Sequence, residues 1–599
     1  MAVVARPPAR AWHALAHATL ASACALAAHA SRAQEPSVLT VPRLAQFSSL
    51  DPVRGYDQTV EQVARQVYST LMTYSYLERP YKLEPDLLEA MPMVSADKLT
   101  WTFKLRPGVR FVDNPCFPGG TGRELTADDV LYSLKRYADG NLNNASWFAL
   151  QGAVVGLDDY HAATVKAGAG ADLTAVDVPG LRKIDKLTFT ITLTHENALF
   201  LHALTLMPTA IVPREAVAFY KDRFQVNPVG TGPFMATREL TRNGTLRLVR
   251  NPRYYRTYPS AGAPGDAQAG LLKDAGKRLP IVDAMEMPLI EEPQPGALKF
   301  LRGELDWRPL DRAWFSKMVV RNAGGGFRLA DEYAGKFVIY FVPSMETEYL
   351  LVNMKDPVLG GNKLLRQAIA AAVDPQVLID VLHNGLGRRL QSPPPPDLPG
   401  GERETGALAR PHDIAAARKL LAQAGYPDGK GLEPITLSFF ETTSTTRNEF
   451  DLLKAQLAAI GIQAKGQFMD QPTFTKAAEN GNFQIASYGW VADYPDAEDF
   501  YQLNYSRNEP PGSNWARYAN PAYDKAYEES RFMANGAERL ARFRTMNALI
   551  QDDVPMILLF TPLKYGITQN WIGNFKRNLL LQEHMYMSVD MARKKKGVQ

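Results

Sequence analysis

The stretch LTWTFKLRPGVRF, at residues 99–111, carries the clearest signal for the fold class. Its first seven residues alternate between apolar and polar side chains, so every second residue from Leu99 to Leu105 faces the same side of a strand. Residues 187–193 repeat this alternation with Phe189 and Ile191 on the inner side. Both stretches are therefore predicted to be half-buried β-strands.

Helical patterns lie between the strand patterns. Thr126, followed three residues later by Asp129, is typical of a capping box at a helix start. Asp413 precedes a periodic apolar run at residues 414–424, and residues 449–460 carry a second amphipathic pattern. Strand and helix patterns that alternate along a chain predict an α/β fold.

The length of the chain predicts more than one folded unit. It has 599 residues, and single hydrophobic cores stop growing near about 250–300 residues, so at least two lobes are expected. Apolar residues make up 46% and charged residues 22%, as in ordinary soluble globular proteins. This balance argues against a membrane protein with many spans.

The N-terminus has the features of a secretory signal. Arg6 and Arg10 precede an uncharged, Ala-rich stretch at residues 14–30. Ser31 and Ala33 then place small residues at the positions that a signal peptidase requires. We predict a signal peptide at residues 1–33, cleavage before Gln34, and a periplasmic mature protein.

Three alternatives remain for the N-terminal segment. A membrane anchor is one, but the apolar stretch is short and is interrupted by polar residues such as His17. Cleavage after Ala30 fits the same small-residue pattern. A lipoprotein would be anchored at Cys24, but the residue three positions before it, Ala21, is not the large aliphatic residue usual there. The cleaved, soluble form is the preferred interpretation.

The charge of the mature chain excludes one class of partner. Removing the three arginines of the signal leaves 64 of the 67 basic residues against 63 acidic ones, a net charge near +1. Nucleic-acid binding requires a clustered basic face. We therefore expect no nucleic-acid partner.

Recognisable catalytic and metal-binding motifs are missing. No histidine after residue 33 pairs with another His, Cys or acid at metal-ligand spacing. The chain has no G-x-S-x-G elbow, no phosphate-binding Gly-rich loop and no C-x-x-C motif. We expect no catalytic residue, no metal and no cofactor; an exported hydrolase with scattered catalytic residues is the remaining enzyme hypothesis.

Aromatic residues gather beside carboxylates at residues 488–496, YGWVADYPD, after a strand-like pattern at residues 483–486. Trp490 can form an apolar wall, and a half-buried Asp493 can pair with a ligand ammonium. A strand that ends in such residues suits a binding site at a sheet edge. The alternative is structural: Trp490 and Tyr494 lie in the core, and Asp493 lies in a turn or caps a helix.

Several motifs, in this order, resemble those of one known family, the extracellular solute-binding proteins of peptide, nickel and related ABC importers. The motifs cover nearly the whole mature chain: LDP at 50–52, QVYSTL at 66–71, LTWTFKLRPGVRF at 99–111, LTADDV at 125–130, PVGTGPF at 228–234, NPRYY at 251–255, LRQAI at 365–369, ARKLLAQAGY at 417–426, WVADYPD at 490–496 and DDVP at 552–555.

The resemblance implies a type II periplasmic binding protein, in which two lobes close around a ligand and an extra domain is inserted early. It implies the following division after the signal at 1–33: lobe I at 34–80, the inserted domain at 81–209, lobe I again at 210–330, lobe II at 331–559, and the end of lobe I at 560–599.

The resemblance also implies binding residues. Asp493 matches the residue that pairs with a peptide's α-ammonium, and Gly489 and Trp490 match neighbours that contact the peptide. Tyr349 and Asn353 match a strand on the opposite wall. The implied function is to capture a small peptide and deliver it to a membrane-embedded ABC permease, as a monomer.

One departure concerns the ligand carboxylate. Ser487 occupies the place of an Arg that some peptide binders use for the peptide C-terminus. Relatives with the same Asp motif bind other solutes, so a nickel chelate, haem, glutathione or an opine is the alternative cargo.

Overall fold

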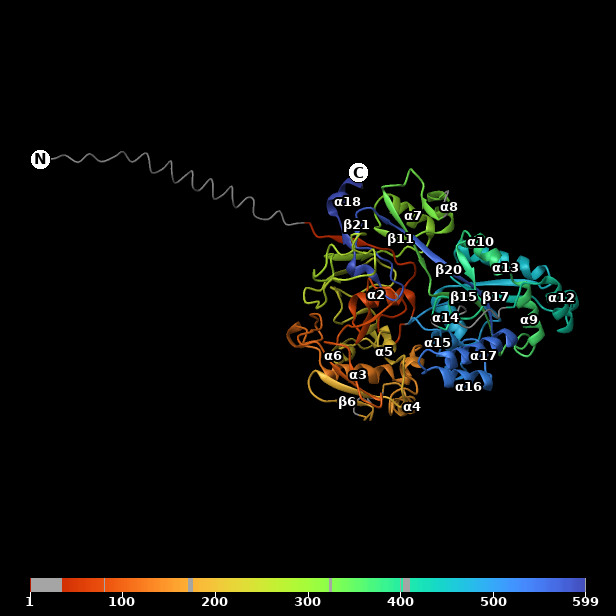
Figure 1. The fold of residues 1–599 in the computed structure, drawn as a ribbon, viewed down its shortest axis with the longest axis horizontal. Coiled ribbons are helices and arrows are strands. Elements are labelled where there is room, and N and C mark those ends of the chain that lie inside the picture. The colour runs from red at the N-terminus through yellow and green to blue at the C-terminus, as the bar shows by residue number, and fades with distance from the viewer. Residues whose placement is uncertain are drawn as a thin grey trace.

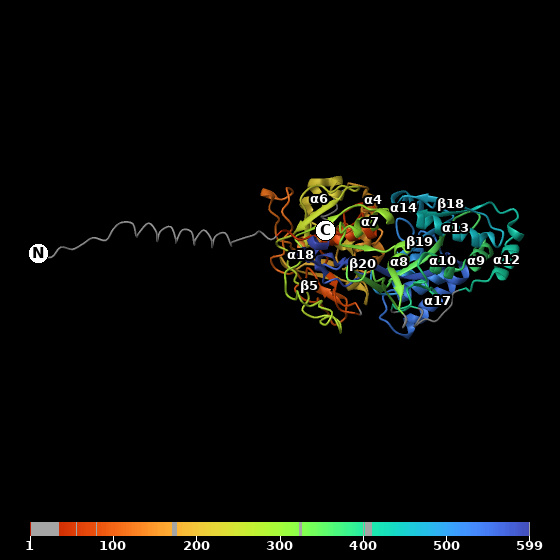
Figure 2. The ribbon, with the colours of Figure 1, turned by 90° about the horizontal axis from the view of Figure 1, so that it is seen from above.

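The computed structural model describes residues 1, 35–55, 57–79, 81–170, 176–322, 326–398, 400–401 and 410–597. The predicted signal segment, apart from Met1, lies outside these ranges. Two lobes lie side by side (Figures 1 and 2), one from the red-to-yellow N-terminal part of the chain and one from its cyan and blue part. The C-terminus returns to the first lobe. The predicted two-lobed α/β architecture is confirmed.

The first lobe contains a four-stranded sheet in the order β1-β10-β9-β8, in which β1 and β10 are parallel. The C-terminal part of the chain packs there too, because Tyr586 and Met587 belong to the same buried core as Leu39 of β1 and Met285 of β10, and β21 pairs with β22 beside them. These elements are β1 (Val38–Thr40), α2 (Gln58–Val67), β8 (Phe234–Ala236), β9 (Leu246–Arg250), β10 (Ala284–Met287), β21 (Ile572–Gly573), β22 (Ser588–Val589) and α18 (Met591–Gly597).

A second sheet of the first lobe contains both predicted strands. Its order is β4-β5-β7-β6, and Phe103 stacks on Phe189 at 5.0 Å between ring centres. The predicted capping box of Thr126 and Asp129 begins α3. The elements here are β2 (Met72–Tyr74), β3 (Leu83–Pro85), β4 (Met93–Val94), β5 (Thr100–Lys104), α3 (Ala127–Tyr137), α4 (Leu157–Ala167), β6 (Leu181–Lys183), β7 (Thr188–Thr192), α5 (Phe200–Ala203) and α6 (Arg214–Tyr220).

The second lobe is built on an eight-stranded mixed sheet with the path β11-β20-β15-β19-β17-β18; β14 and β16 also pair with β20. Its strands are β11 (Trp307–Pro309), β14 (Phe337–Pro343), β15 (Glu346–Val352), β16 (Gly387–Arg389), β17 (Ile435–Phe440), β18 (Ala464–Met469), β19 (Ile485–Val491) and β20 (Met556–Gln569).

Helices cover both faces of this sheet. One face packs against α9 (Lys363–Ala372), α10 (Pro375–Leu382), α12 (Ile414–Gln423) and α13 (Ser444–Ala458). The other packs against α14 (Gln471–Glu479), α16 (Pro521–Ser530) and α17 (Ala537–Asp553), with α15 (Glu498–Tyr501) beside them. Asp413 caps α12 as predicted. The helix α13 begins five residues before the predicted start, because the Thr443 side chain caps it by accepting from the Thr446 amide.

The long strand β20 connects the lobes. Its first residues pair with β15 inside the second lobe, and its last residues pair with β14 and β11 beside the first lobe. The small elements around this crossing are α7 (Pro293–Leu301), α8 (Arg312–Met318), β12 (Val319–Arg321) and β13 (Phe327–Leu329). The predicted domain boundary at residue 560 falls within β20; the domain division stays a prediction.

The lobes also contact each other away from β20. The Arg531 guanidinium of the second lobe donates to the carbonyls of Phe148, at 2.9 Å, and Gln151, at 3.0 Å, in the first. The Phe532 ring lies 4.0 Å from the His195 ring, centre to centre. Within the described ranges, no helix is long and apolar enough to cross a membrane.

Candidate ligand-binding site

The strand β19 has one incompletely paired edge. Its partner β15 pairs with it from Ile485 to Val491, but β17 pairs only with Ile485 to Ser487. Among the residues that the structure describes, no strand pairs with that edge from Tyr488 to Val491, and these residues are half-buried. Such an edge can pair with the backbone of an extended ligand.

Asp499 holds the loop that follows this strand. Its Oδ2 atom accepts from the Asp493 amide at 2.7 Å and from the Trp490 indole N–H at 3.2 Å. Its side chain is fully buried, and Oδ1 has no hydrogen-bond partner among the described residues. Burial and then the neighbouring Asp493 carboxylate raise the pKa of Asp499 well above its ordinary value. Asp499 therefore sets the positions of Trp490 and Asp493.

The Asp493 loop faces the first lobe. Burial raises the pKa of Tyr74 in β2 and of Tyr137 in α3, and the Asp493 carboxylate adds to both shifts. The Tyr74 hydroxyl lies 2.7 Å from His202 Nδ1, and the His202 ring lies 6.1 Å from the Tyr494 ring. The alternative that Asp493 caps a helix is wrong, because α15 begins at Glu498 with Ala497 as its N-cap, whereas Tyr494 is buried in the core as that alternative predicted.

Gly489 lies in the unpaired part of β19, opposite Glu348. A Cβ atom at this position would come within 2.8 Å of Glu348 Oε2, so a larger residue would displace that carboxylate. Burial and then the Glu346 carboxylate raise the pKa of Glu348, and Glu346 forms an ion pair with Lys564. The strand edge is therefore flanked by acidic groups.

The structure does not bring Tyr349 and Asn353 together with Asp493. Tyr349 is buried in the core of the second lobe, with its ring 6.4 Å from that of Tyr488. The Asn353 side chain donates to the carbonyls of Gly481, at 3.0 Å, and Phe483, at 2.9 Å. Both side chains support the strands behind the site, and their contact with ligand stays a prediction.

Ser487, which occupies the place of an Arg in some peptide binders, lies next to an acidic residue. Its hydroxyl donates to Glu449 of α13. Burial raises the pKa of Glu449 to about 7. This part of the second lobe therefore offers no positive charge to a ligand carboxylate from Ser487 or Glu449.

Replacing Glu449 by Gln is expected to remove a pH dependence of stability. Between the ordinary pKa of 4.5 and the folded value of about 7, the folded protein binds a proton that the unfolded chain has released. The stability of the wild type therefore falls as pH rises through this window and stays lower above it. In thermal melts, E449Q should be more stable than wild type at pH 8 and similar at pH 4. An equal difference at both pH values, or the same profile for the exposed-site control Glu538→Gln, would contradict this.

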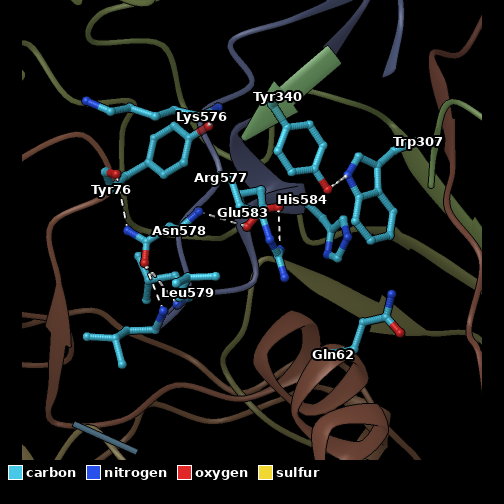
Figure 3. Close-up of polar contacts among 12 residues, drawn as sticks. Gln62, Tyr76, Trp307, Tyr340, Lys576, Arg577, Asn578, Leu579, Glu583 and His584 are labelled. Carbon is cyan, nitrogen blue, oxygen red and sulfur yellow. Dashed lines mark hydrogen bonds and ion pairs between the residues drawn. The ribbon is translucent and has the colours of Figure 1, made fainter. Parts of the chain in front are cut away.

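A second group of half-buried polar and aromatic side chains lies where β20 connects the lobes, as Figure 3 shows. The Trp307 indole of β11 donates to the Tyr340 hydroxyl of β14 at 3.0 Å. The Arg577 guanidinium lies 5.7 Å from the Trp307 ring centre and donates from Nη1 to Glu583 at 2.7 Å. Sequence reasoning missed this group, because positions 307, 340 and 577 share no local pattern.

A cavity of about 600 Å³ lies next to these side chains in the first lobe. It is lined by Tyr81, Arg79 and His202, among others, and by the loop at residues 262–264. His202 connects it to Tyr494 of the second lobe, and Tyr81 accepts from the Leu579 amide close to Arg577. Cavities of this size suit small-molecule ligands.

Residues 82–511 match the family model described as "Bacterial extracellular solute-binding proteins, family 5 Middle". Di/tripeptide-binding protein 2 of Pseudomonas aeruginosa is 24% identical over 92% of this chain and 94% of its own length. Heme-binding protein A of Haemophilus influenzae is 25% identical over 82% of this chain and 81% of its own length.

Solved structures share the fold. The periplasmic binding protein DppA of Helicobacter pylori, in complex with the peptide STSA, has a TM-score of 0.76 and 21% identity, covering 92% of this chain and 98% of that one. OppA of Haemophilus influenzae, in complex with RPPGFSPFR, has a TM-score of 0.74 and 20% identity, covering 93% and 99%.

Proposed function

Because the chain belongs to family 5 of the bacterial extracellular solute-binding proteins, we propose that it binds short peptides between its two lobes and delivers them to an ABC importer. Family members are binding proteins, and we propose no catalytic activity. Relatives named as di- and tripeptide-binding proteins support a peptide cargo.

The observation that carries this proposal is the half-exposed edge of β19, which leads into a loop that faces the first lobe. The edge supplies backbone hydrogen bonds to an extended ligand. Asp493 pairs with the ligand's ammonium, Trp490 forms an apolar wall, and Gly489 leaves room for the ligand backbone. Tyr349 and Asn353 support the strands that lie behind the site.

Haem is the second candidate cargo, because a haem-binding protein is among the relatives. A nickel chelate, glutathione or an opine would use the same fold. Mass spectrometry of the ligand that co-purifies with protein from the periplasm tests the proposal. Peptides released on denaturation support it, whereas haem or another solute in stoichiometric amount would overturn it. Turnover of peptides by the purified protein would favour the hydrolase hypothesis.

The remaining parts of the proposal concern architecture and assembly. We propose lobe I at 34–80, 210–330 and 560–599, the inserted domain at 81–209 and lobe II at 331–559. The protein acts as a monomer with a membrane-embedded permease as its partner and needs no cofactor.

The mature protein is expected to begin at Gln34 and to be released into the periplasm. The reason is the arrangement of Arg6, Arg10 and the Ala-rich stretch before Ala33. N-terminal sequencing of the periplasmic fraction measures this. A lipid on Cys24, or a chain that keeps its first 33 residues, would contradict the prediction.

A further inference from the structure

The guanidinium of Arg577 keeps part of its hydrogen-bonding capacity unused. Nη1 donates to Glu583, but Nε and Nη2 form no hydrogen bond to the residues that the structure describes. The side chain is 24% exposed, whereas its partner Glu583 is 1% exposed. Glu583 therefore orients the guanidinium from the buried side, and part of the Arg577 side chain stays accessible beside Trp307.

The Tyr340 hydroxyl adds a donor beside this fork. It accepts from the Trp307 indole, and its own hydrogen has no acceptor among the described residues. The Arg577 guanidinium lies 5.7 Å from the ring centre of the same Trp307, so both groups border one indole. Figure 3 shows Arg577, Tyr340 and Trp307 converging from three segments.

These donors match one ligand chemistry. A planar guanidinium and a neighbouring hydroxyl fit the two oxygens of a carboxylate, and aromatic walls strengthen the pairing by excluding water. Burial lowers the pKa of Arg577, but the neighbouring Glu583 carboxylate raises it by more. The pKa of the guanidinium therefore lies above its ordinary value. The side chain therefore stays cationic at every physiological pH.

The position relative to the second lobe fits an extended ligand. Tyr340 lies opposite Gly566 on β20, and Glu348 beside Gly489 lies opposite Phe560. These positions are six residues apart, or about 20 Å along the strand. An extended peptide needs about six residues or more to cover that length. Asp493 offers a negative group from the second lobe, and Arg577 offers a positive one from the first.

We propose that Arg577 of the first lobe, together with the Tyr340 hydroxyl of β14, forms a subsite between the lobes that binds the C-terminal carboxylate of the peptide. The subsite rests on the proposed function. Arg577 supplies the positive charge for the carboxylate from the first lobe. Ser487 of the second lobe cannot supply it, because its hydroxyl donates to the Glu449 carboxyl group.

Peptide amides provide the test. L-Alanine peptides of about six to eight residues, which are long enough to cover this distance, are titrated calorimetrically as free acids and as C-terminal amides into wild type, Tyr340→Phe and Arg577→Lys. Hydrogen bonds to charged groups make amidation weaken wild-type binding by about tenfold to a hundredfold. Tyr340→Phe removes one donor, and Arg577→Lys keeps the partner of Glu583 but removes the fork, so each variant should show an amidation penalty several times smaller.

Two substitutions away from the subsite serve as controls. Tyr565→Phe removes a hydroxyl that bonds Asn384, and Arg182→Lys alters an exposed ion pair with Asp177. Both should keep the wild-type penalty. Equal binding of acids and amides by wild type, or an unchanged penalty in both Tyr340→Phe and Arg577→Lys, would overturn the subsite alone. If neither form binds, the peptide function fails and the subsite fails with it.

Discussion

Replacing Asp493 by Asn is expected to weaken binding of a peptide with a free N-terminus by at least about a hundredfold. Breaking a buried ion pair costs roughly 3–5 kcal/mol, because the remaining charge stays out of water. The ligand-free protein should melt at nearly the wild-type temperature. Asp499 holds the loop by accepting hydrogen bonds from the Asp493 backbone amide and the Trp490 indole, and the substitution keeps both donors.

Acetylation of the peptide amine separates the anchor from other effects of this substitution. It should weaken binding to wild type by a factor similar to that of Asp493→Asn, and add little further loss in the variant. Calorimetric titration of the four combinations measures the coupling. Equal affinity of wild type for acetylated and free peptides would show that Asp493 is not the ammonium anchor.

Replacing Asp496 by Asn is expected to cause the largest loss of stability. Asp496 accepts two hydrogen bonds from Arg539, at 2.7 and 2.8 Å, and the two side chains are 4% and 1% exposed. Leaving the Arg539 charge buried without its partner costs roughly 3–5 kcal/mol. For the second lobe this corresponds to a drop in melting temperature on the order of 10 °C.

An exposed ion pair provides the control for this substitution. Lys98 and Glu196 lie 2.6 Å apart but are 60% and 58% exposed, so Glu196→Gln should change stability by less than about 1 kcal/mol. A wild-type melting curve for Asp496→Asn would contradict the assignment. The contrast with Asp493 is informative, because two carboxylates three residues apart should affect different properties, one binding and the other folding.

Local sequence patterns were sufficient to predict several strands and helices. The alternation at residues 99–105 predicted β5, and the capping box of Thr126 and Asp129 predicted the start of α3. These signals are reliable because the side chains that specify the element are only a few residues apart. The start of α13 was predicted less well, because the pattern used apolar spacing and overlooked Thr443 as a cap.

The motif at residues 490–496 was also visible in the sequence, but the roles within it were not. Asp493, Asp496 and Asp499 look alike as acidic residues in one short stretch. The fold faces Asp493 toward the first lobe, pairs Asp496 with Arg539, and buries Asp499 beneath the loop. Their different surroundings, and not their identity, separate binding, stability and positioning.

The sequence by itself determined the alternation of strands and helices, the need for two lobes and the family, because these depend on local spacing, on length and on the order of motifs. Tertiary structure alone decided which side chains meet across long separations. Trp307, Tyr340 and Arg577 come together because β20 pairs with β11 and β14 and the chain then returns to the first lobe. Strand pairing of this kind depends on burial of whole sheet faces, which leaves no periodic trace at the residues that it brings together.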